Sequence, residues 1–247
     1  IGFSDPYLVC FTMDYVANTM IVGAGEVGKS LYAVLKDYHE AYIRDLQPIE
    51  IEGQVEILNI CFPYQDGFET AVKMYQDEYK PAVTIIHSSV PIGTSRKLNA
   101  CHSPIHGKHP NLSNGIRTFV KYLGGADPLQ LEMAEDFLKK AQINVVVVPS
   151  PDDSEHSKLA CTRRYGMSIV EMKELKKECD LNGTNFDVVY GWNQFYNDGY
   201  RRLGMGHFTR PMLEYNEGKI GGHCVVPNCR LLDGPLSDFI LEKDESY

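Results

Sequence analysis

Three closely spaced glycines near the start of the chain carry the most specific chemistry in the sequence. They stand in the order G-x-G-x-x-G, between an apolar stretch and a segment with helical periodicity. In such a turn the first glycine allows a tight bend, the second lets a pyrophosphate approach the backbone, and the third lets helix pack on strand. The N–H groups of the helix N-terminus then bind phosphate. The pattern predicts a dinucleotide site formed by Gly23, Gly25, Glu26, Val27 and Gly28.

An acidic residue follows the second expected strand, at the spacing that ribose recognition requires. Asp45 stands about 20 residues after Gly25. A carboxylate there accepts hydrogen bonds from ribose hydroxyls and repels a 2′-phosphate, so NAD is expected as the cofactor and not NADP. Arg44 beside it weakens this preference. The alternative interpretation is a glycine-rich turn without a ligand, including one that has lost its cofactor.

A cysteine near the end of the chain follows two glycines and a histidine, in the order Gly221, Gly222, His223, Cys224. The glycines let the backbone bend and leave the sulfur accessible. A protonated His223 would favour the thiolate, which is the nucleophilic form. Most free cysteines are instead buried and unreactive, and the spacing alone leaves both interpretations open.

A loop after the fourth expected strand carries three of the eight histidines, His102, His106 and His109. It is expected at the carboxyl edge of the sheet, where ligands bind. It could be a polar surface loop, a substrate loop in which His109 acts as a base, or a metal site with His223 as a further ligand. The sequence has no ligand spacing typical of zinc, so we predict no metal.

The overall composition narrows the class of protein. The chain has 247 residues, with 43% hydrophobic and 23% charged residues, which is ordinary for one large globular domain or two modest ones. A net charge of −9 argues against a nucleic-acid partner, which would need a basic face. No apolar run approaches the roughly 18–20 residues of a membrane span, so no membrane partner is expected.

The seven cysteines are odd in number and widely scattered, and none forms a C-x-x-C pair. A secreted disulfide framework would show an even number at closer spacing. The start of the chain lacks the basic and apolar regions of a signal peptide, and it also lacks an initiator Met. We therefore expect reduced thiols and a cytoplasmic protein.

The elements that must position these residues alternate between strands and helices. This alternation is typical of βαβ units, and we predict an α/β fold with a doubly wound, mostly parallel sheet of the Rossmann type. The run of four valines near residue 146 predicts a strand buried on both faces. Strands are expected at 18–22, 41–44, 55–62, 82–88, 118–123 and 144–148, and helices at 26–37, 68–79 and 128–141.

The pattern changes near residue 150. A long helix is expected at 153–179 and a second at 186–196, with an irregular, glycine-rich remainder to Tyr247. We predict an NAD-binding domain at 1–150 and a helical dimerisation or substrate domain at 151–247. The apolar stripe of the long helix is typical of core or dimer contacts. The aromatic segment 190–196 could pack in a core or wall a substrate pocket.

Several further segments complete a longer pattern with the glycine turn. The pattern resembles the UDP-glucose/GDP-mannose dehydrogenase family from about residue 18 to residue 230. The serine-valine-proline-x-glycine-threonine loop and the Gly-Gly-x-Cys motif are the most specific parts of this resemblance. The matching segments are Gly23–Gly28, Cys61–Pro63, Ser88–Thr94, Ser103-Pro104, Gly124-Gly125, Ser157–Leu159 and Gly221–Cys224.

The resemblance implies a chemistry for particular side chains. That family oxidises the C6 alcohol of a nucleotide sugar to a carboxylate in two NAD-linked hydride transfers, by way of a cysteine thioester. Cys224 would be the nucleophile, and Lys158 would stabilise the developing oxyanion. Ser89 would replace a threonine that positions water. Pro63 and Ser88 are assigned to the cofactor, and the long helix is expected to form a homodimer.

The sequence departs from the family pattern at acid–base positions. Thr162 stands at the asparagine four residues after the lysine, and Asn228 at the aspartate four residues after the cysteine. Ile105 replaces one loop glutamate, and a second glutamate falls near His109. The third, nucleotide-holding domain of the family has no counterpart in this sequence. We nevertheless keep His109 and Asn228 among the candidate catalytic residues.

The sequence as a whole predicts an NAD-dependent dehydrogenase that oxidises an alcohol and uses a cysteine nucleophile. A sugar or nucleotide sugar is the candidate small-molecule substrate, and the altered acid–base groups leave a single two-electron oxidation open. A non-catalytic NAD or sugar-nucleotide binding protein is the alternative. A third hypothesis is a chain that needs a partner subunit to complete its substrate site.

Overall fold

The computed structural model describes residues 16–110 and 112–247. The chain divides into two compact units, residues 1–158 and 159–247, and the division falls inside helix α6 (Pro151–Asn182). The domain boundary predicted near residue 150 stands at the start of this helix. The first unit carries the sheet, and the second consists of helices and their connections.

A five-stranded sheet forms the centre of the first unit. All its neighbouring strands pair in parallel, and their order is β2-β1-β3-β4-β5. The direction of the strand order reverses between β1 and β3, because β2 pairs on the other side of β1. This arrangement confirms the predicted α/β fold with a parallel sheet. The strands are β1 (Asn18–Val22), β2 (Glu40–Arg44), β3 (Ile57–Ile60), β4 (Val83–Ile86) and β5 (Cys101–His102).

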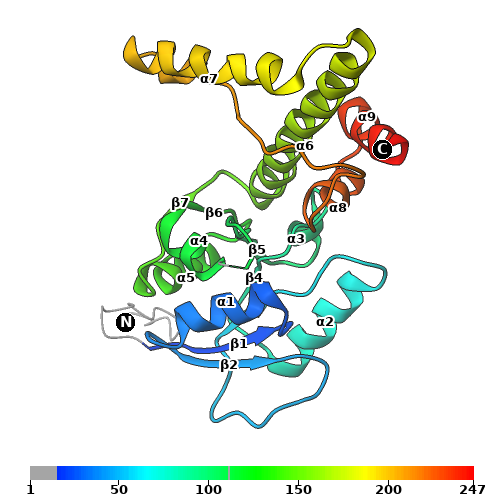
Figure 1. The fold of residues 1–247 in the computed structure, drawn as a ribbon. Coiled ribbons are helices and arrows are strands. Elements are labelled where there is room, and N and C mark those ends of the chain that lie inside the picture. Colours follow the sequence, from blue (N-terminus) through cyan, green and yellow to red (C-terminus); the bar gives the residue numbers. More distant parts are fainter. Residues whose placement is uncertain (1–15, 111) are drawn as a thin grey trace. The chain divides into compact units, whose positions relative to one another are not determined.

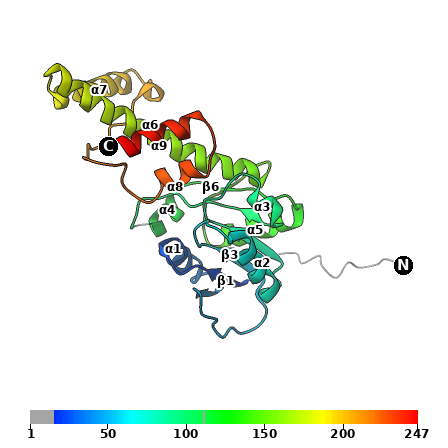
Figure 2. The same cartoon turned by 90° about the vertical axis from the view of Figure 1, so that its right-hand side faces the viewer.

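Helices cover both faces of this sheet, as a doubly wound fold requires, and α1 and α2 lie on opposite sides of the strands (Figures 1 and 2). Leu31 of α1 and Phe137 of α5 belong to the core on one face, and Phe68 of α2 and Leu98 beyond α3 to the core on the other. The helices of this unit are α1 (Glu26–Leu35), α2 (Phe68–Tyr79), α3 (Thr94–Lys97), α4 (Leu112–Thr118) and α5 (Pro128–Lys140).

A second, two-stranded parallel sheet corrects two predictions. It contains β6 (Lys121–Leu123) and β7 (Val145–Val147), and β5 reaches it by one antiparallel bridge. The strand expected at 118–123 begins later, because α4 extends to Thr118. The valine strand is not buried on both faces: Val146 and Val147 are 43% and 40% exposed. Among the described residues, β7 pairs only with β6. Its composition is therefore that of an interior strand, but it lies at the edge of a sheet.

The second unit is more helical than the sequence predicts. Two helices occupy the stretch expected to be irregular, because Val225 and Ile240 form a buried cluster with Val170 of α6. Gly166 makes this packing possible, since a Cβ there would lie 2.6 Å from a Val225 methyl. No helix in the described ranges is long and apolar enough to cross a membrane. The elements after α6 are α7 (Phe186–Arg202), η1 (Gly206–Phe208), α8 (Val225–Arg230) and α9 (Pro235–Ser246).

Candidate functional site

The glycine turn lies at the point where the strand order reverses. Gly23 follows β1 with a φ of +103°, and a Cβ there would lie 2.7 Å from the backbone nitrogen of Phe62, beyond β3. A Cβ on Gly28 would lie 1.9 Å from the Gly23 carbonyl oxygen. Only glycine fits at these two positions, and they hold α1 against the ends of β1 and β3. Ligands of doubly wound folds bind at this reversal point.

The turn also leaves room and donors for an anion. A Cβ at Gly25 would meet nothing within 4 Å, so the backbone is open on that side. Gly25 is the N-cap of α1 and supplies no side-chain cap. The first N–H groups of α1, at Glu26 and Val27, therefore have no side-chain acceptor at the cap. An open glycine before an uncapped helix N-terminus fits a pyrophosphate.

The two residues at the end of β2 differ in their surroundings. Arg44 is 6% exposed and donates hydrogen bonds to Glu78 (2.7 Å) and Tyr79 (2.5 Å) at the end of α2. Its guanidinium also lies 5.3 Å from the ring centre of Tyr75. Asp45 is exposed. The Asp45 carboxylate is therefore accessible to a ligand at this edge of the sheet, whereas Glu78 and Tyr79 of α2 hold the Arg44 guanidinium.

The ends of β3 and β4 are joined beside the glycine turn. Ser88 donates its hydroxyl to the Phe62 carbonyl over 2.6 Å and is nearly buried. Pro63, next to that carbonyl, is exposed, and Ser89 is half-buried. Pro63, Ser88 and Ser89 thus lie on connected loops at the carboxyl edge of the sheet.

A buried polar network crosses the interior of the sheet, and sequence reasoning missed it. Asn59 donates to Thr19 over 2.7 Å, and its carbonyl oxygen lies 2.9 Å from Nε2 of His87. The other ring nitrogen of His87 lies 2.8 Å from the Ser103 carbonyl. Burial lowers the pKa of His87 well below its ordinary value. The signal in the sequence was a polar residue inside or just after an apolar strand, as at Asn59 and His87.

Two lysines hold the loop that follows β5. Lys121 is 2% exposed and donates to the carbonyl oxygens of Ser103 and Pro104, the latter over 3.0 Å. Lys158 donates to the next carbonyl, that of Ile105, over 2.8 Å. Burial, together with the smaller effect of the Lys158 charge, lowers the pKa of Lys121 to about 7. The hydrogen bonds from Lys121 and Lys158 to three consecutive carbonyl oxygens therefore hold this loop in place.

The first turns of α6 hold Lys158 at the carboxyl edge of the five-stranded sheet. The buried carboxylate of Glu155 accepts hydrogen bonds from the backbone N–H groups of Gly93 (2.6 Å) and Ser95 (2.8 Å). Ser154 lies 2.9 Å from a ring nitrogen of His102. These contacts anchor the start of α6 to the loop after β4 and to β5, so Lys158 belongs to the sheet edge.

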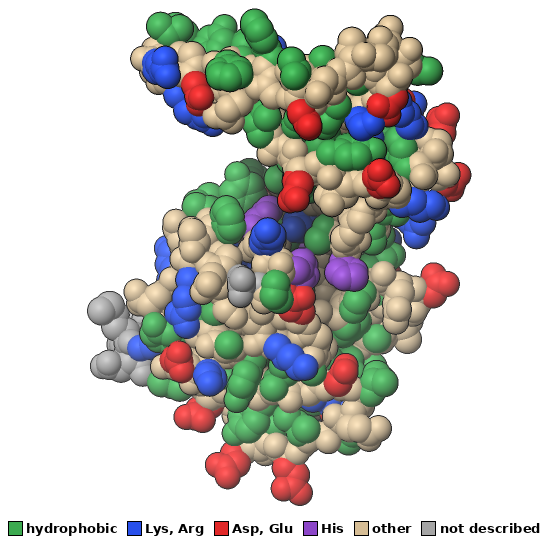
Figure 3. Space-filling view, viewed as in Figure 1, with side chains coloured by type: hydrophobic (Ala, Val, Ile, Leu, Met, Phe, Trp, Pro, Cys, Tyr) green, Lys and Arg blue, Asp and Glu red, His purple; other side chains and the backbone are tan. Residues whose placement is uncertain are grey.

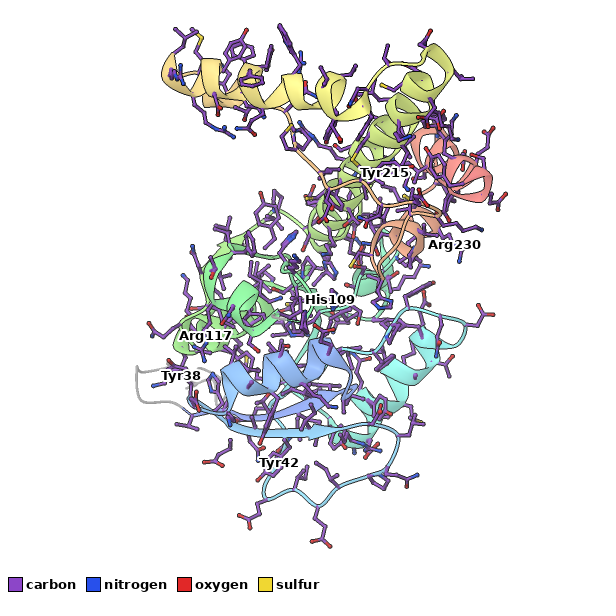
Figure 4. All side chains as sticks on the ribbon, in the orientation of Figure 1. Tyr38, Tyr42, His109, Arg117, Tyr215 and Arg230 are labelled. Carbon is purple, nitrogen blue, oxygen red and sulfur yellow. The ribbon has the colours of Figure 1, made fainter. Side chains whose placement is uncertain are left out.

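The three histidines of the loop point to different partners. His102 is buried, and burial lowers its pKa to about 3. His106 is half-buried near Phe119, and burial lowers its pKa to about 4. Nδ1 of His109 lies 2.5 Å from the Glu26 carboxylate, at the glycine turn (Figure 4). Within residues 16–110 and 112–247, no three side chains of the metal-binding types are grouped as a site.

Cys224 belongs to the second unit and is the N-cap of α8. It is half-buried, and its carbonyl accepts the N–H of Asn228 over 3.0 Å. The preceding Gly222 has a φ of +82°, a conformation that suits glycine. The Asn228 side chain is buried and donates to the Thr162 hydroxyl over 3.1 Å. Two of the positions that depart from the family pattern are thus hydrogen-bonded to each other.

Comparison with known proteins shows the fold. No family model and no curated protein matches the sequence. Among solved structures, a UDP-D-ManNAc dehydrogenase from Pyrococcus horikoshii matches with 14% identity and a TM-score of 0.75, over 92% of this chain and 68% of that one. A UDP-glucose dehydrogenase from Pyrobaculum islandicum matches with 14% identity and a TM-score of 0.73, over 99% and 70%.

A smaller enzyme matches over nearly its whole length. The 3-hydroxyisobutyrate dehydrogenase of Mycobacterium tuberculosis, solved with L-serine, has 12% identity and a TM-score of 0.68, over 92% of each chain. The chain therefore has the Rossmann-like fold of these dehydrogenases, and the likeness to nucleotide-sugar dehydrogenases inferred from the motifs is confirmed at the level of the fold.

Proposed function

We propose that this protein is an NAD-dependent dehydrogenase that oxidises an alcohol group of a small molecule. The observation that carries the proposal is the glycine turn at the strand reversal, which is open at Gly25 and leads into the uncapped N-terminus of α1. This is the arrangement that binds the pyrophosphate of a dinucleotide. The likeness to solved dehydrogenases supports a nicotinamide cofactor.

The end of β2 favours NAD over NADP. The exposed Asp45 can accept hydrogen bonds from the ribose hydroxyls and repels a 2′-phosphate. Arg44 could otherwise bind that phosphate, but Glu78 and Tyr79 already hold its guanidinium. Gly23, Glu26, Val27, Gly28, Pro63 and Ser88 complete the proposed cofactor site.

Lys158 is the residue we assign to the alcohol oxygen. A bound nicotinamide would supply the acceptor for the hydride of the alcohol carbon, and the hydroxyl proton would leave to a base or to water. Lys158 lies at the carboxyl edge of the sheet and is anchored by its bond to Ile105 and by the start of α6. An ammonium there stabilises negative charge that develops on the oxygen.

The number of oxidation steps depends on Cys224. As nucleophile, Cys224 would capture the aldehyde, and a second hydride transfer would give a thioester for water to hydrolyse. Ser89, His109 and Asn228 are the candidates to position that water. However, Ile105 is buried and apolar, Asn228 is neutral, and His109 pairs with Glu26.

A second substrate class follows from these replacements. The positions where the resembled family has acid–base groups carry no carboxylate in this chain, which favours a single two-electron oxidation. The 3-hydroxyisobutyrate dehydrogenase that this chain matches over 92% of its length is a dehydrogenase of comparable size. A small hydroxy acid is therefore the second candidate substrate, beside a sugar or nucleotide sugar.

Two further properties belong to the proposal. The odd number of scattered cysteines indicates a cytoplasmic protein, and the described cysteines are all free thiols. We also infer a homodimer, which the resemblance implies. A protein that binds NAD or a sugar nucleotide without turnover remains the alternative function.

The test begins with calorimetric titrations of the protein with NAD and with NADP, followed by turnover assays. UDP-glucose, UDP-N-acetylmannosamine and 3-hydroxyisobutyrate serve as substrates, with the formation of reduced cofactor as the signal. NAD binding with turnover of any of these supports the dehydrogenase. NAD binding without turnover favours the non-catalytic alternative, and binding of neither dinucleotide overturns the proposal.

A further inference from the structure

Arg44, the last residue of β2, is buried in the first unit although it lies beside the proposed cofactor site. Its backbone carbonyl accepts the N–H of Gly23 over 2.9 Å, so its backbone borders the glycine turn. Successive side chains of a strand point to opposite faces of the sheet. Ile43 therefore packs on the face covered by α1, and Arg44 lies with Tyr42 on the face covered by α2.

The end of α2 brings three side chains to this arginine from one helix face. Tyr75, Glu78 and Tyr79 have the i, i+3, i+4 spacing of neighbours on a helix surface. The Arg44 guanidinium lies 5.3 Å and 5.9 Å from the ring centres of Tyr75 and Tyr79. One of its terminal nitrogens donates to the Glu78 carboxylate over 2.7 Å and to the Tyr79 hydroxyl over 2.5 Å. This face of α2 therefore supplies one cation with a negative charge, a hydroxyl acceptor and two aromatic rings.

The other N–H groups of the guanidinium are also largely used. Nε donates to the backbone carbonyl of Asp45, and the second terminal nitrogen donates to that of Leu46, each over 3.3 Å. Four of the five N–H donors of Arg44 therefore have acceptors within the chain. Arginine binds phosphate best with two parallel N–H groups on neighbouring nitrogens. In this conformation Arg44 does not have such a pair available.

The segment that follows β2 carries no cation of its own. Residues 45–56 contain four carboxylates and no lysine or arginine. Figure 3 shows acidic side chains in red at the bottom of the view, where the loop after β2 lies in Figure 1. A ribose 2′-phosphate at the end of β2 would therefore meet the negative charge of this segment, beginning with the exposed Asp45. Arg44 is the residue next to this segment that could neutralise such a phosphate.

We propose that Glu78 and Tyr79 are specificity-determining residues, which set the preference for NAD by keeping the Arg44 guanidinium away from a 2′-phosphate. The inference rests on the dinucleotide site proposed above and adds a determinant outside it, on a helix that need not contact the cofactor. Asp45 acts on the ribose directly, whereas the end of α2 acts through the arginine. Without its two acceptors on α2, Arg44 is a buried cation short of partners, and a 2′-phosphate becomes its best acceptor.

Calorimetric titrations of the full chain with NAD and with NADP test the proposal. The variants are Glu78→Ala, Tyr79→Phe and the double variant. The ratio of NADP affinity to NAD affinity should rise on the order of 10-fold in the double variant and less in each single variant, because a freed guanidinium can bind the 2′-phosphate. The Glu78 side chain is 40% exposed and Tyr79→Phe keeps the ring, so the variants should fold, which thermal denaturation checks. An unchanged ratio in a folded double variant that still binds NAD contradicts the proposal.

A second comparison separates release of the arginine from the simple loss of a carboxylate. Arg44→Met keeps an unbranched apolar side chain and removes the N–H donors. In this background, Glu78→Ala combined with Tyr79→Phe should change the ratio of NADP affinity to NAD affinity by less than about 2-fold, because no guanidinium is left to release. A rise as large as that in the protein with Arg44 would show that the Glu78 charge acts directly, and the proposal would be wrong.

Glu69→Ala is the matched control. Glu69 lies in the first turn of the same helix, at the opposite end from Glu78, and pairs with Lys97 over 3.5 Å. Its removal should leave the ratio unchanged, and a rise equal to that of Glu78→Ala would count against a specific role of Glu78. A wild type that binds neither dinucleotide overturns the proposed function together with this inference. A wild type that binds NAD, with an unchanged ratio in the double variant, overturns the inference alone.

Discussion

The three glycines of the turn are required for different reasons. Gly23 and Gly28 are required by backbone packing, since a Cβ at either position would meet backbone atoms at 2.7 Å or less. No packing contact within the chain requires a glycine at position 25, because the space beside Gly25 is open. A glycine that the fold does not need, at the position proposed for the pyrophosphate, is what a dinucleotide site would require.

This difference predicts opposite effects of two alanine substitutions. Gly28→Ala should lower the free energy of unfolding by about 2 kcal/mol or more, as overpacking does. Gly25→Ala should leave that free energy within about 0.5 kcal/mol but weaken NAD binding on the order of 10-fold, because the methyl occupies the pyrophosphate position. Chemical denaturation and calorimetric titration measure the two effects. Unchanged NAD affinity in Gly25→Ala would place the pyrophosphate elsewhere.

The buried amine of Lys121 predicts a pH dependence of stability. Its pKa is about 7 in the folded protein and about 10.4 in the unfolded chain, so between these values the unfolded state binds more protons. This contribution makes the protein more stable as pH rises from 7 towards 10. The wild type should gain on the order of 1–2 kcal/mol more than Lys121→Met between pH 7 and pH 9.

Denaturation of both proteins at the two pH values measures that difference. The comparison also removes the opposing effect of the cysteines. Burial raises the pKa of Cys61 and of Cys101 to about 12, and these two thiols are the same in both proteins. Equal pH slopes would show that Lys121 keeps its proton when folded.

Cys224 is proposed to act only in the four-electron version of the proposed reaction. Cys224→Ser should abolish formation of the acid from an alcohol while leaving NAD affinity unchanged, because the thiol belongs to the second unit and the glycine turn to the first. Product analysis and NAD titration are the measurements. An enzyme that performs one hydride transfer at the wild-type rate after this substitution would support the hydroxy-acid alternative.

At the scale of elements, the second unit is held by polar and apolar contacts of α8 with α6. The Thr162–Asn228 hydrogen bond is buried on the Asn228 side, and Val225 and Cys229 lie in the apolar cluster beside it. The bond fixes the helix that begins at Cys224. The two residues differ from the pattern of the resembled family, and in this chain they contact each other.

A double-mutant cycle measures this contact. Thr162→Val and Asn228→Ala should each lower the free energy of unfolding by about 1–2 kcal/mol, because each leaves a partner unsatisfied. The double variant should lose less than the sum by roughly 1 kcal/mol. Additive losses would show that the two side chains do not interact in solution.

The sequence predicted elements well where periodicity and tertiary packing agree. β1 and α2 have the predicted bounds, since each is an apolar run or amphipathic stretch ended by glycine or proline. It failed for α8 and α9, which are stabilised by contacts with Val170, far away in the chain. It also missed Lys121, because no local pattern shows that a lysine will be buried against the carbonyls of residues 103 and 104.

The candidate site was predictable only in part for the same reason. The glycine turn is a local motif and was found from its spacing. The pairing of His109 with Glu26 joins residues far apart in the sequence, so the role assigned to His109 as a substrate base had no local evidence for or against it.

On the scale of the whole molecule, the proposed cofactor residues all lie in the first unit. NAD should therefore slow hydrogen exchange in the first turns of α1 and leave exchange in α7 of the second unit unchanged. Mass spectrometry of peptides from both regions measures this. Slowing of exchange in both regions would show that cofactor binding also changes the second unit.

The position of the unit boundary inside α6 limits how the protein can be divided into fragments. A gene shortened to residue 150 would encode the whole parallel sheet and yet remove Glu155 and Lys158. The N–H groups of Gly93 and Ser95 would lose their acceptor, and the Ile105 carbonyl would lose its donor. The shortest stable fragment that carries the proposed cofactor site should therefore end after Lys158, several residues into the helix that a sequence-based boundary would discard.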